Sequence, residues 1–309
     1  MASNTLYYLF VDILLLTLQL LSAVGNGFII CLFLASKRLR QNQCLRLLLL
    51  LCFTDWVFVI LTLPYTIYFI ANWNEVSLHY DSQMVISLGA PITLHYKLNL
   101  IITNAIAIDR LQAMCKPTYY RMKNHMRFVW LTLLLGLAMG FIDVVLMFVF
   151  TELDNEIPNC AALLCFLNKR FRGYWGISNI ILNSVLLILT ICVAYELKHQ
   201  RNKSQHSQMY NVKSQLKENG TGDKLSFAIL LTSVIFLLMP SNIVGVTTLI
   251  QSKMFIYFGP FYFAGMLFAG VLNSIIYMTL HAEVRHAAKT LITKRTFKID
   301  SGLTVVSTS

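Results

Sequence analysis

Several long apolar stretches of this sequence are interrupted by polar residues that can form hydrogen bonds or ion pairs. An amide or charged group inside such a stretch is costly to bury, so each one requires a partner or a function. The residues in question are Asn26, Asp55, Asn99, Asp109, Arg110, Asn273 and Tyr277. Groups of this kind can hold helices together, bind a ligand or switch between two arrangements.

One polar stripe lies on the third of these apolar stretches. Asn99, Thr103 and Arg110 follow one another at near-helical spacing, so they share one face of a helix. We expect this face to point into the protein, where Asn99 could meet Asp55 and Asn273. The candidate ligand contacts precede Asn99 on the same stretch and are Ile92, Thr93, Tyr96 and Lys97.

Lys97 is the most informative of these candidates. It precedes Arg110 by 13 positions, which is about 20 Å along a helix. A lysine at that depth needs an anion. Two interpretations stay open: Lys97 binds an acidic group of a ligand, or it forms a structural pair with Asp143 on the next apolar stretch.

Composition shows which elements must position these residues. The chain has 309 residues, of which 57% are hydrophobic and only 13% are charged, about half the charged fraction of ordinary soluble domains. A helix that crosses the hydrocarbon core needs about 20 apolar residues. The stretches that qualify are Tyr7–Ser36, Leu45–Ala71, Gln83–Leu111, Phe128–Thr151, Gly173–Leu197, Leu225–Ile250 and Met254–Leu280. The sequence therefore predicts an all-α membrane protein, a seven-transmembrane helix bundle formed by a single domain over residues 1–309.

The basic residues predict the orientation of this bundle. Twenty of the 25 Lys and Arg residues fall in the loops and tail on one side, and only Lys169, Arg170, Arg172 and Lys253 fall on the other. The richer side is expected to be cytoplasmic, with the N-terminus outside. The same distribution explains the net charge of +11 without a nucleic-acid partner.

A short amphipathic helix is predicted after the last span, at Ala282–Thr293, with residues 294–309 as a tail. Val284, Ala287, Ala288 and Leu291 recur at helical spacing, while Glu283, Arg285, His286 and Lys289 occupy the other face. Such a helix should lie in the membrane interface and contact anionic lipids.

The polar residues stand in an order that resembles the rhodopsin-like G-protein-coupled receptors. The matching stretches are Gly25-Asn26, Leu51–Asp55, Ala107–Leu111 with the following Ala113, Cys115, Lys116, Pro117 and Tyr120, and Asn273–Tyr277. Short length and short termini are similar to chemosensory receptors, most of all the nematode serpentine chemoreceptors. The stretch after Arg110 also resembles vertebrate odorant receptors.

The resemblance implies a receptor for a small extracellular molecule that activates a heterotrimeric G protein at its cytoplasmic face. Asp109 would restrain Arg110 in the silent state. The implied core polar network is Asn26, Asp55 and Asn99, and the cluster of Asp55, Asn99 and Asn273 would hold waters or a sodium ion, with the ion at Asp55 and Asn99. The residues implied in coupling and activation are Asp109, Arg110, Pro117, Tyr120, Pro240, Asn273 and Tyr277. Pro240 removes a backbone hydrogen bond and should kink the sixth span. The implied location is the plasma membrane, with a sensory cilium as a candidate.

Several positions depart from the family pattern. Leu111 replaces the usual Tyr, Ser274 the usual Pro, and Leu238 the usual Trp of the sixth span. Cys160 and Cys165 lie in a predicted outer loop and are candidates for a local disulfide. These departures keep open a receptor-like protein that does not couple to a G protein.

Two other function classes fit the sequence less well. A transporter would show paired halves with interrupted spans, which seven unpaired spans do not. An enzyme is not expected: His281-Ala282-Glu283 has the order of a zinc deaminase motif, but no Pro-Cys-x-x-Cys accompanies it. No cofactor is expected, and the sequence names neither the ligand nor the G-protein subtype.

Overall fold

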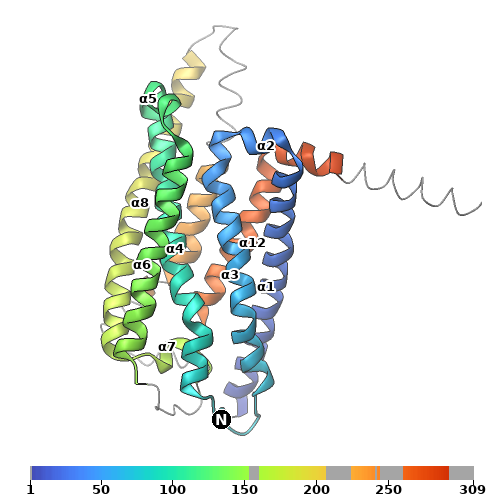
Figure 1. The fold of residues 1–309 in the computed structure, drawn as a ribbon, viewed down its shortest axis with the longest axis vertical. Coiled ribbons are helices and arrows are strands. Elements are labelled where there is room, and N and C mark those ends of the chain that lie inside the picture. The colour runs from blue at the N-terminus through green and yellow to red at the C-terminus, as the bar shows by residue number, and fades with distance from the viewer. Residues whose placement is uncertain (1, 153–159, 207–223, 241, 244–259, 292–309) are drawn as a thin grey trace, which may run out of the picture.

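The computed structural model describes residues 2–152, 160–206, 224–240, 242–243 and 260–291, and throughout that part of the chain regular structure is helical. The long helices run roughly parallel and antiparallel to one another in one elongated bundle (Figure 1). They are α1 (Ala2–Ala35), α3 (Arg46–Ala71), α4 (Ser82–Cys115), α6 (His125–Phe150), α8 (Lys169–His206) and α12 (Phe261–Leu280). Each of these six contains an apolar segment long enough to cross a membrane.

A seventh, shorter apolar helix spans Lys224–Leu238. Its last five residues, η2 (Val234–Leu238), are π-helical and end two positions before Pro240. The predicted span Leu225–Ile250 is thus helical as far as it is described, and residues 244–250 lie outside the described part. So do residues 254–259 at the start of the last predicted span.

Short helices connect the long ones. They are α2 (Lys37–Gln41), the 3-10 turn η1 (Gln43–Leu45), α5 (Pro117–Met122) and α7 (Leu163–Phe166). Side chains of Asp81 and Asn124 accept hydrogen bonds from backbone amides in the first turns of α4 and α6, where such amides have no partner inside the helix. Pro117 begins α5, because proline at this position loses no helical hydrogen bond.

Two helices continue past the predicted C-terminal ends of their spans. α4 continues to Cys115 and α8 to His206, whereas the predictions ended at Leu111 and Leu197. The predictions used apolar length, which marks the membrane crossing, while a helix can continue into water with polar residues. Residues 282–291 are also helical and turn away from the bundle beside α2 (Figure 1). Residues 292–309, and with them the predicted tail, lie outside the described part.

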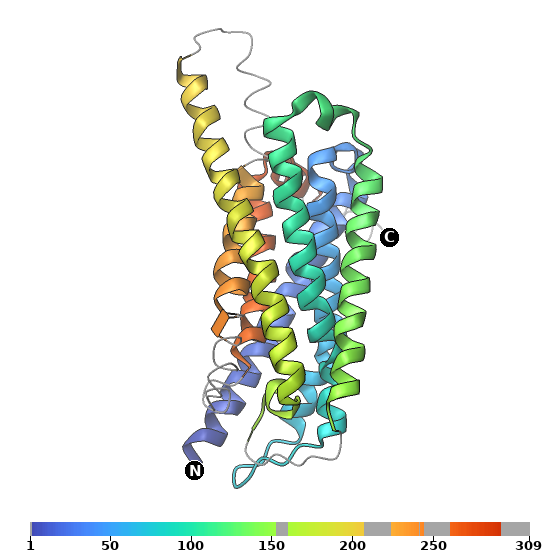
Figure 2. The ribbon, with the colours of Figure 1, turned by 90° about the vertical axis from the view of Figure 1, so that its left-hand side faces the viewer.

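The helix α4 is the centre of the bundle. It packs against α3, α6 and α8, while α1 packs against α3 and α12, and Figure 2 shows α4 between α6 and α8. Side chains of α4 are mostly buried, but α6 exposes large apolar residues such as Trp130, Leu134 and Val149. An exposed apolar face of this extent is unfavourable in water and suits lipid. The chain is therefore a multi-pass membrane protein.

Candidate functional site

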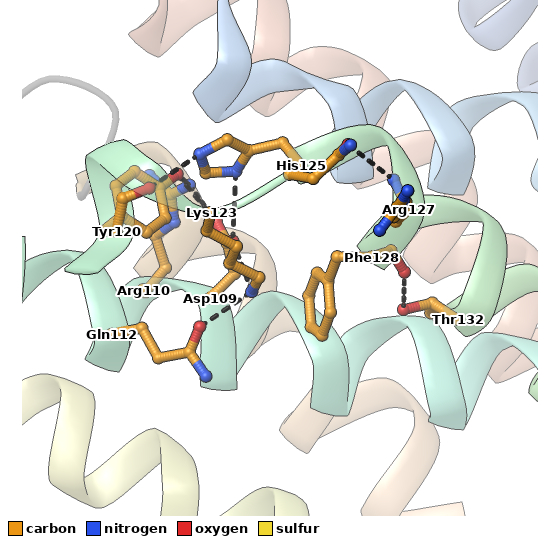
Figure 3. A network of polar contacts seen from close by, with 10 residues as sticks. Asp109, Arg110, Gln112, Tyr120, Lys123, His125, Arg127, Phe128 and Thr132 are labelled. Carbon is orange, nitrogen blue, oxygen red and sulfur yellow. Dashed lines mark hydrogen bonds and ion pairs between the residues drawn. The ribbon is translucent and has the colours of Figure 1, made fainter.

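The end of the bundle that carries α2, α5 and residues 282–291, called the basic end below, contains the pair predicted at Asp109 and Arg110. Arg110 Nη2 donates to Asp109 Oδ2 at 2.5 Å, and both side chains are buried (Figure 3). Neighbouring residues on a helix do not face each other directly. The long arginine side chain reaches back to make the contact.

Tyr120 of α5 joins these two residues. Its hydroxyl accepts a hydrogen bond from Arg110 Nη2 and donates one to Asp109 Oδ2, both at 3.1 Å. The helix α5 begins at Pro117, which directs the chain back over the end of α4 and brings Tyr120 to the pair (Figure 3). The sequence prediction named Tyr120 and Pro117, but not this shared hydroxyl.

Two further basic residues face Asp109. Lys123 Nζ lies 3.7 Å and His125 Nδ1 3.9 Å from Asp109 Oδ1. Lys123 also donates to Gln112 Oε1 at 2.7 Å and lies 3.3 Å from the ring centroid of Phe128. Burial lowers the pKa of Lys123 from its ordinary value, and the Asp109 charge opposes that shift. The sequence prediction missed His125, since contact across a loop leaves no periodic signal.

Asp55 forms a second polar cluster in the middle of the bundle. Its Oδ1 lies 3.1 Å from His95 Nε2 and accepts a hydrogen bond from Asn99 Nδ2 at 3.2 Å. The contact between Asn99 and Asp55 was expected, but His95 was missed. The His95 ring also stacks on Phe58, with centroids 4.0 Å apart.

Several oxygens around Asp55 have no hydrogen-bond partner in the described structure. They are Asp55 Oδ2, Asn26 Oδ1, Asn99 Oδ1 and Asn273 Oδ1. Asn26 is fixed through its amide nitrogen, which donates to Ser22 Oγ and the Gly270 carbonyl. Hard oxygen acceptors of this kind suit water or a hard cation, so the residues fit a sodium ion in part. His95 already occupies one Asp55 oxygen, and no group of three or more His, Cys, Asp or Glu side chains placed to bind a metal occurs among the described residues.

Lys97 and Asp143 meet in the centre of the bundle, with Lys97 Nζ 3.3 Å from Asp143 Oδ2. Lys97 also donates to Ser178 Oγ at 2.5 Å and to Asn179 Oδ1 at 2.6 Å, both on α8. The hydroxyl of Tyr174 donates to Asp143 Oδ1 at 2.9 Å. Each charge in this buried group therefore has polar partners, and three helices contribute to it.

The other candidate ligand contacts on α4 point in different directions. Ile92, Thr93 and Tyr96 are all buried. Thr93 Oγ1 contacts Met147 Sδ of α6 at 3.5 Å, whereas Tyr96 donates to the Leu237 carbonyl of η2 at 3.1 Å and accepts from Asn183 of α8 at 3.3 Å. Adjacent positions on a helix differ by about 100° in direction, so the described structure does not gather these residues around one cavity.

Tyr277 and Pro240, two further residues predicted to act in activation, each lie against a neighbouring helix. Tyr277 donates to the Leu48 carbonyl of α3 at 2.7 Å. Near Pro240, a Cβ added to Gly265 of α12 would collide with the Phe236 carbonyl oxygen and lie 3.1 Å from Pro240 Cγ. Pro240 has no amide hydrogen for that carbonyl, and only glycine lets α12 approach it so closely.

Cys160 forms a disulfide with Cys165 of α7. Within this loop the Leu163 amide donates to the Tyr65 hydroxyl of α3 at 3.0 Å, which holds the loop against the end of the bundle opposite the basic end.

A groove of about 610 Å³ lies at the basic end between the end of α1, α2 and residues 282–291. Glu283 closes one side of it, because it pairs with Arg38 at 2.6 Å and accepts from Asn42 Nδ2 at 3.3 Å. This groove lies beside the helical segment predicted to rest in the membrane interface.

Apolar helices that enclose buried ion pairs, with a basic end built around Asp109 and Arg110, define a helical-bundle membrane protein. Residues 4–283 match the family of serpentine type 7TM GPCR chemoreceptors named Srbc. The chain belongs to this chemoreceptor family, which confirms the family predicted from the sequence. No curated protein matches the chain.

Proposed function

We propose that this protein is a chemosensory receptor that binds a small molecule between its helices and activates a heterotrimeric G protein at the basic end. The observation that carries the proposal is the buried network of Asp109, Arg110 and Tyr120 in a chain of the chemoreceptor family. In the proposed orientation the basic end is cytoplasmic and the N-terminus is outside, because basic residues collect on the cytoplasmic side. The protein would then act at the plasma membrane.

The network is arranged as a restraint on Arg110. Asp109 and Tyr120 hold its guanidinium against the end of α4. Release of this contact would free a permanently charged group for a partner protein. Ligand binding would supply the free energy by favouring one of two helix arrangements. A kink at Pro240 would allow the helix that begins at Lys224 to move its cytoplasmic end.

The inner polar residues fit supporting roles. Waters or a sodium ion would bridge the open acceptors of Asn26, Asp55, Asn99 and Asn273. Lys97 would act as a structural residue, since Asp143 and two polar side chains of α8 already engage it. An acidic ligand would have to displace those partners. Residues 282–291 would lie in the membrane interface as an eighth helix.

The test is signalling by the full-length chain, expressed with a panel of G proteins. Asp109→Asn should raise basal signalling several-fold, because it weakens the restraint, and Arg110→Gln should abolish signalling. Arg127→Gln is the matched control, because Arg127 is an exposed basic residue of the same end. Signalling must be compared at equal surface expression.

If basal and ligand-dependent signals are absent from the parent chain with every G protein, the coupling proposal is wrong and a receptor-like protein that does not couple remains. A signal that persists in Arg110→Gln would assign coupling to other residues.

A further inference from the structure

Asp12 of α1 is a buried carboxylate for which the activation machinery has no use. It lies ten residues from the start of α1 at Ala2, about 15 Å along the helix from the end of the bundle opposite the basic end. Its side chain faces the interior, since the residue is 2% exposed while Phe10 and Ile13 on the outer face of α1 are 66% and 50% exposed.

The carboxyl group of Asp12 has no basic partner among the described residues. Its Oδ2 is buried without a hydrogen-bond partner, and none of the ion pairs found among the described residues includes it. A carboxylate in an apolar interior is stable only if it is neutralised or paired. Asp55, Asp109 and Asp143, the other buried carboxylates discussed above, each have a basic side chain within 3.3 Å.

Aromatic side chains lie near Asp12. The carboxyl group acts electrostatically on the hydroxyls of Tyr8, Tyr65 and Tyr80. Four rings at this end of the bundle form one connected group, with centroids 4.8 Å apart for Tyr65 and Phe69, 4.5 Å for Phe69 and Tyr80, and 5.8 Å for Tyr65 and Phe263. The ring cluster is defined as Tyr65, Phe69, Tyr80 and Phe263.

A second unsatisfied group lies on the same seam between α1 and α3. Thr62 of α3 accepts a hydrogen bond from Gln19 of α1 at 3.1 Å. Thr66 is one turn further along α3 on that face, and its hydroxyl is buried without a partner in the described structure. α1 and α3 are antiparallel, so the step from Thr62 to Thr66 leads towards Asp12.

We propose that Asp12 and the ring cluster bind an organic cation of the alkylammonium class. Aromatic faces attract a desolvated ammonium group through their quadrupole, and a buried carboxylate supplies the opposite charge. The same two features disfavour an anion. The inference rests on the proposed function, because the ligand must enter from the end that the proposed orientation places outside.

The test is ligand-induced thermal stabilisation of the purified full chain in dodecyl maltoside, a detergent without an ammonium group. Choline and 2-phenylethylamine are titrated against their uncharged counterparts 3,3-dimethyl-1-butanol and 2-phenylethanol, with sodium chloride at equal ionic strength. At least one of the two cations should raise the melting temperature saturably, and the alcohols and sodium chloride should not.

Substitutions then locate the effect. Asp12→Asn should weaken cation binding by more than about tenfold and leave the chain folded, since it removes an uncompensated charge. Phe69→Leu should weaken binding less, because it removes one ring. Glu75→Gln is the matched control, as Glu75 is an exposed carboxylate at the same end, and it should bind like the parent chain.

Absence of a saturable shift with both cations overturns the proposal, as does a shift that Asp12→Asn retains. The measurement contains no G protein, so failure of signalling with cation binding intact contradicts only the proposed function. Ligand-dependent signalling without cation binding contradicts only the assignment of Asp12.

Discussion

Asp143 and Asp12 are both almost fully buried carboxylates in membrane-spanning helices, yet their surroundings are opposite. Asp143 meets Lys97 and the hydroxyl of Tyr174, whereas one oxygen of Asp12 has no hydrogen-bond partner in the described structure. The first arrangement stabilises the bundle as it stands. The second leaves a buried carboxyl oxygen that no described residue engages, which is where the proposed cation would bind.

Lys97→Met should have the largest effect on stability and should distinguish the surroundings of Asp143 from those of Asp12. This change leaves Asp143 buried and unpaired, which should cost about 3–5 kcal/mol. Asp12→Asn should leave the stability unchanged or raise it. Thermal denaturation of the two variants in detergent checks the contrast.

The double variant Lys97→Met with Asp143→Leu is the control for this prediction, because it removes both charges and should recover most of the stability. If the double variant is as unstable as Lys97→Met, lost packing rather than an unpaired charge explains the effect.

A second prediction concerns the close packing of α12 against Phe236 and Pro240. Gly265→Ala places a methyl group against the Phe236 carbonyl and Pro240, and such overpacking should cost about 1–3 kcal/mol. Gly173→Ala is the matched control, because nothing lies within 4 Å of a Cβ added there. Equal melting temperatures for the two variants would show that α12 can move away from Phe236 without loss of stability, which would contradict the prediction.

A third prediction concerns the other paired carboxylate, Asp109. Tyr120→Phe removes the hydroxyl that joins Asp109 and Arg110, which should cost about 1 kcal/mol and raise basal signalling less than Asp109→Asn does. Tyr119→Phe, an exposed neighbour, should change neither quantity. Basal signalling and melting temperature together distinguish a loosened restraint from general instability.

The smallest effect should be a pH dependence of the stability of the folded chain. It arises from His281, which follows α12 and is 6% exposed. Burial lowers the pKa of His281 below its ordinary value of 6.5, and Glu283 opposes the shift. The unfolded chain therefore binds a proton more readily, so stability falls as pH falls from 6.5 towards the lowered pKa.

His281→Gln should flatten this dependence, while His286→Gln, at an exposed position, should not. Melting temperatures of the three proteins between pH 7.5 and 5 test this, and an identical slope in all three would assign the dependence to other groups.

The sequence could predict what a single helix encodes. Apolar length located the six helices that are long enough to cross a membrane, and spacing placed Asn99 and Arg110 on a stripe of α4. The contact of Asn99 with Asp55 followed from that stripe. Partners supplied by other helices could not be predicted, because the rotation of each neighbour is set by packing. His95 and the α8 partners Ser178 and Asn179 were missed for this reason.

Asp12 was missed although a signal existed. It is an ionisable residue within the first apolar stretch, and such a residue suggests a function by default. Its aromatic surroundings come from α1, α3, the following loop and α12, so they appear only in three dimensions.

The central position of α4 has a consequence for how the sequence can change over generations. A substitution on the exposed apolar side of α6, at Trp130 or Val149, disturbs little packing, and any apolar residue of similar size serves there. A substitution on α4 changes a helix that packs against three others, so a tolerated change usually requires a second one in a neighbour. Related receptors should therefore diverge quickly along α6 and change α4 mainly in correlated pairs, such as a joint replacement of Lys97 and Asp143.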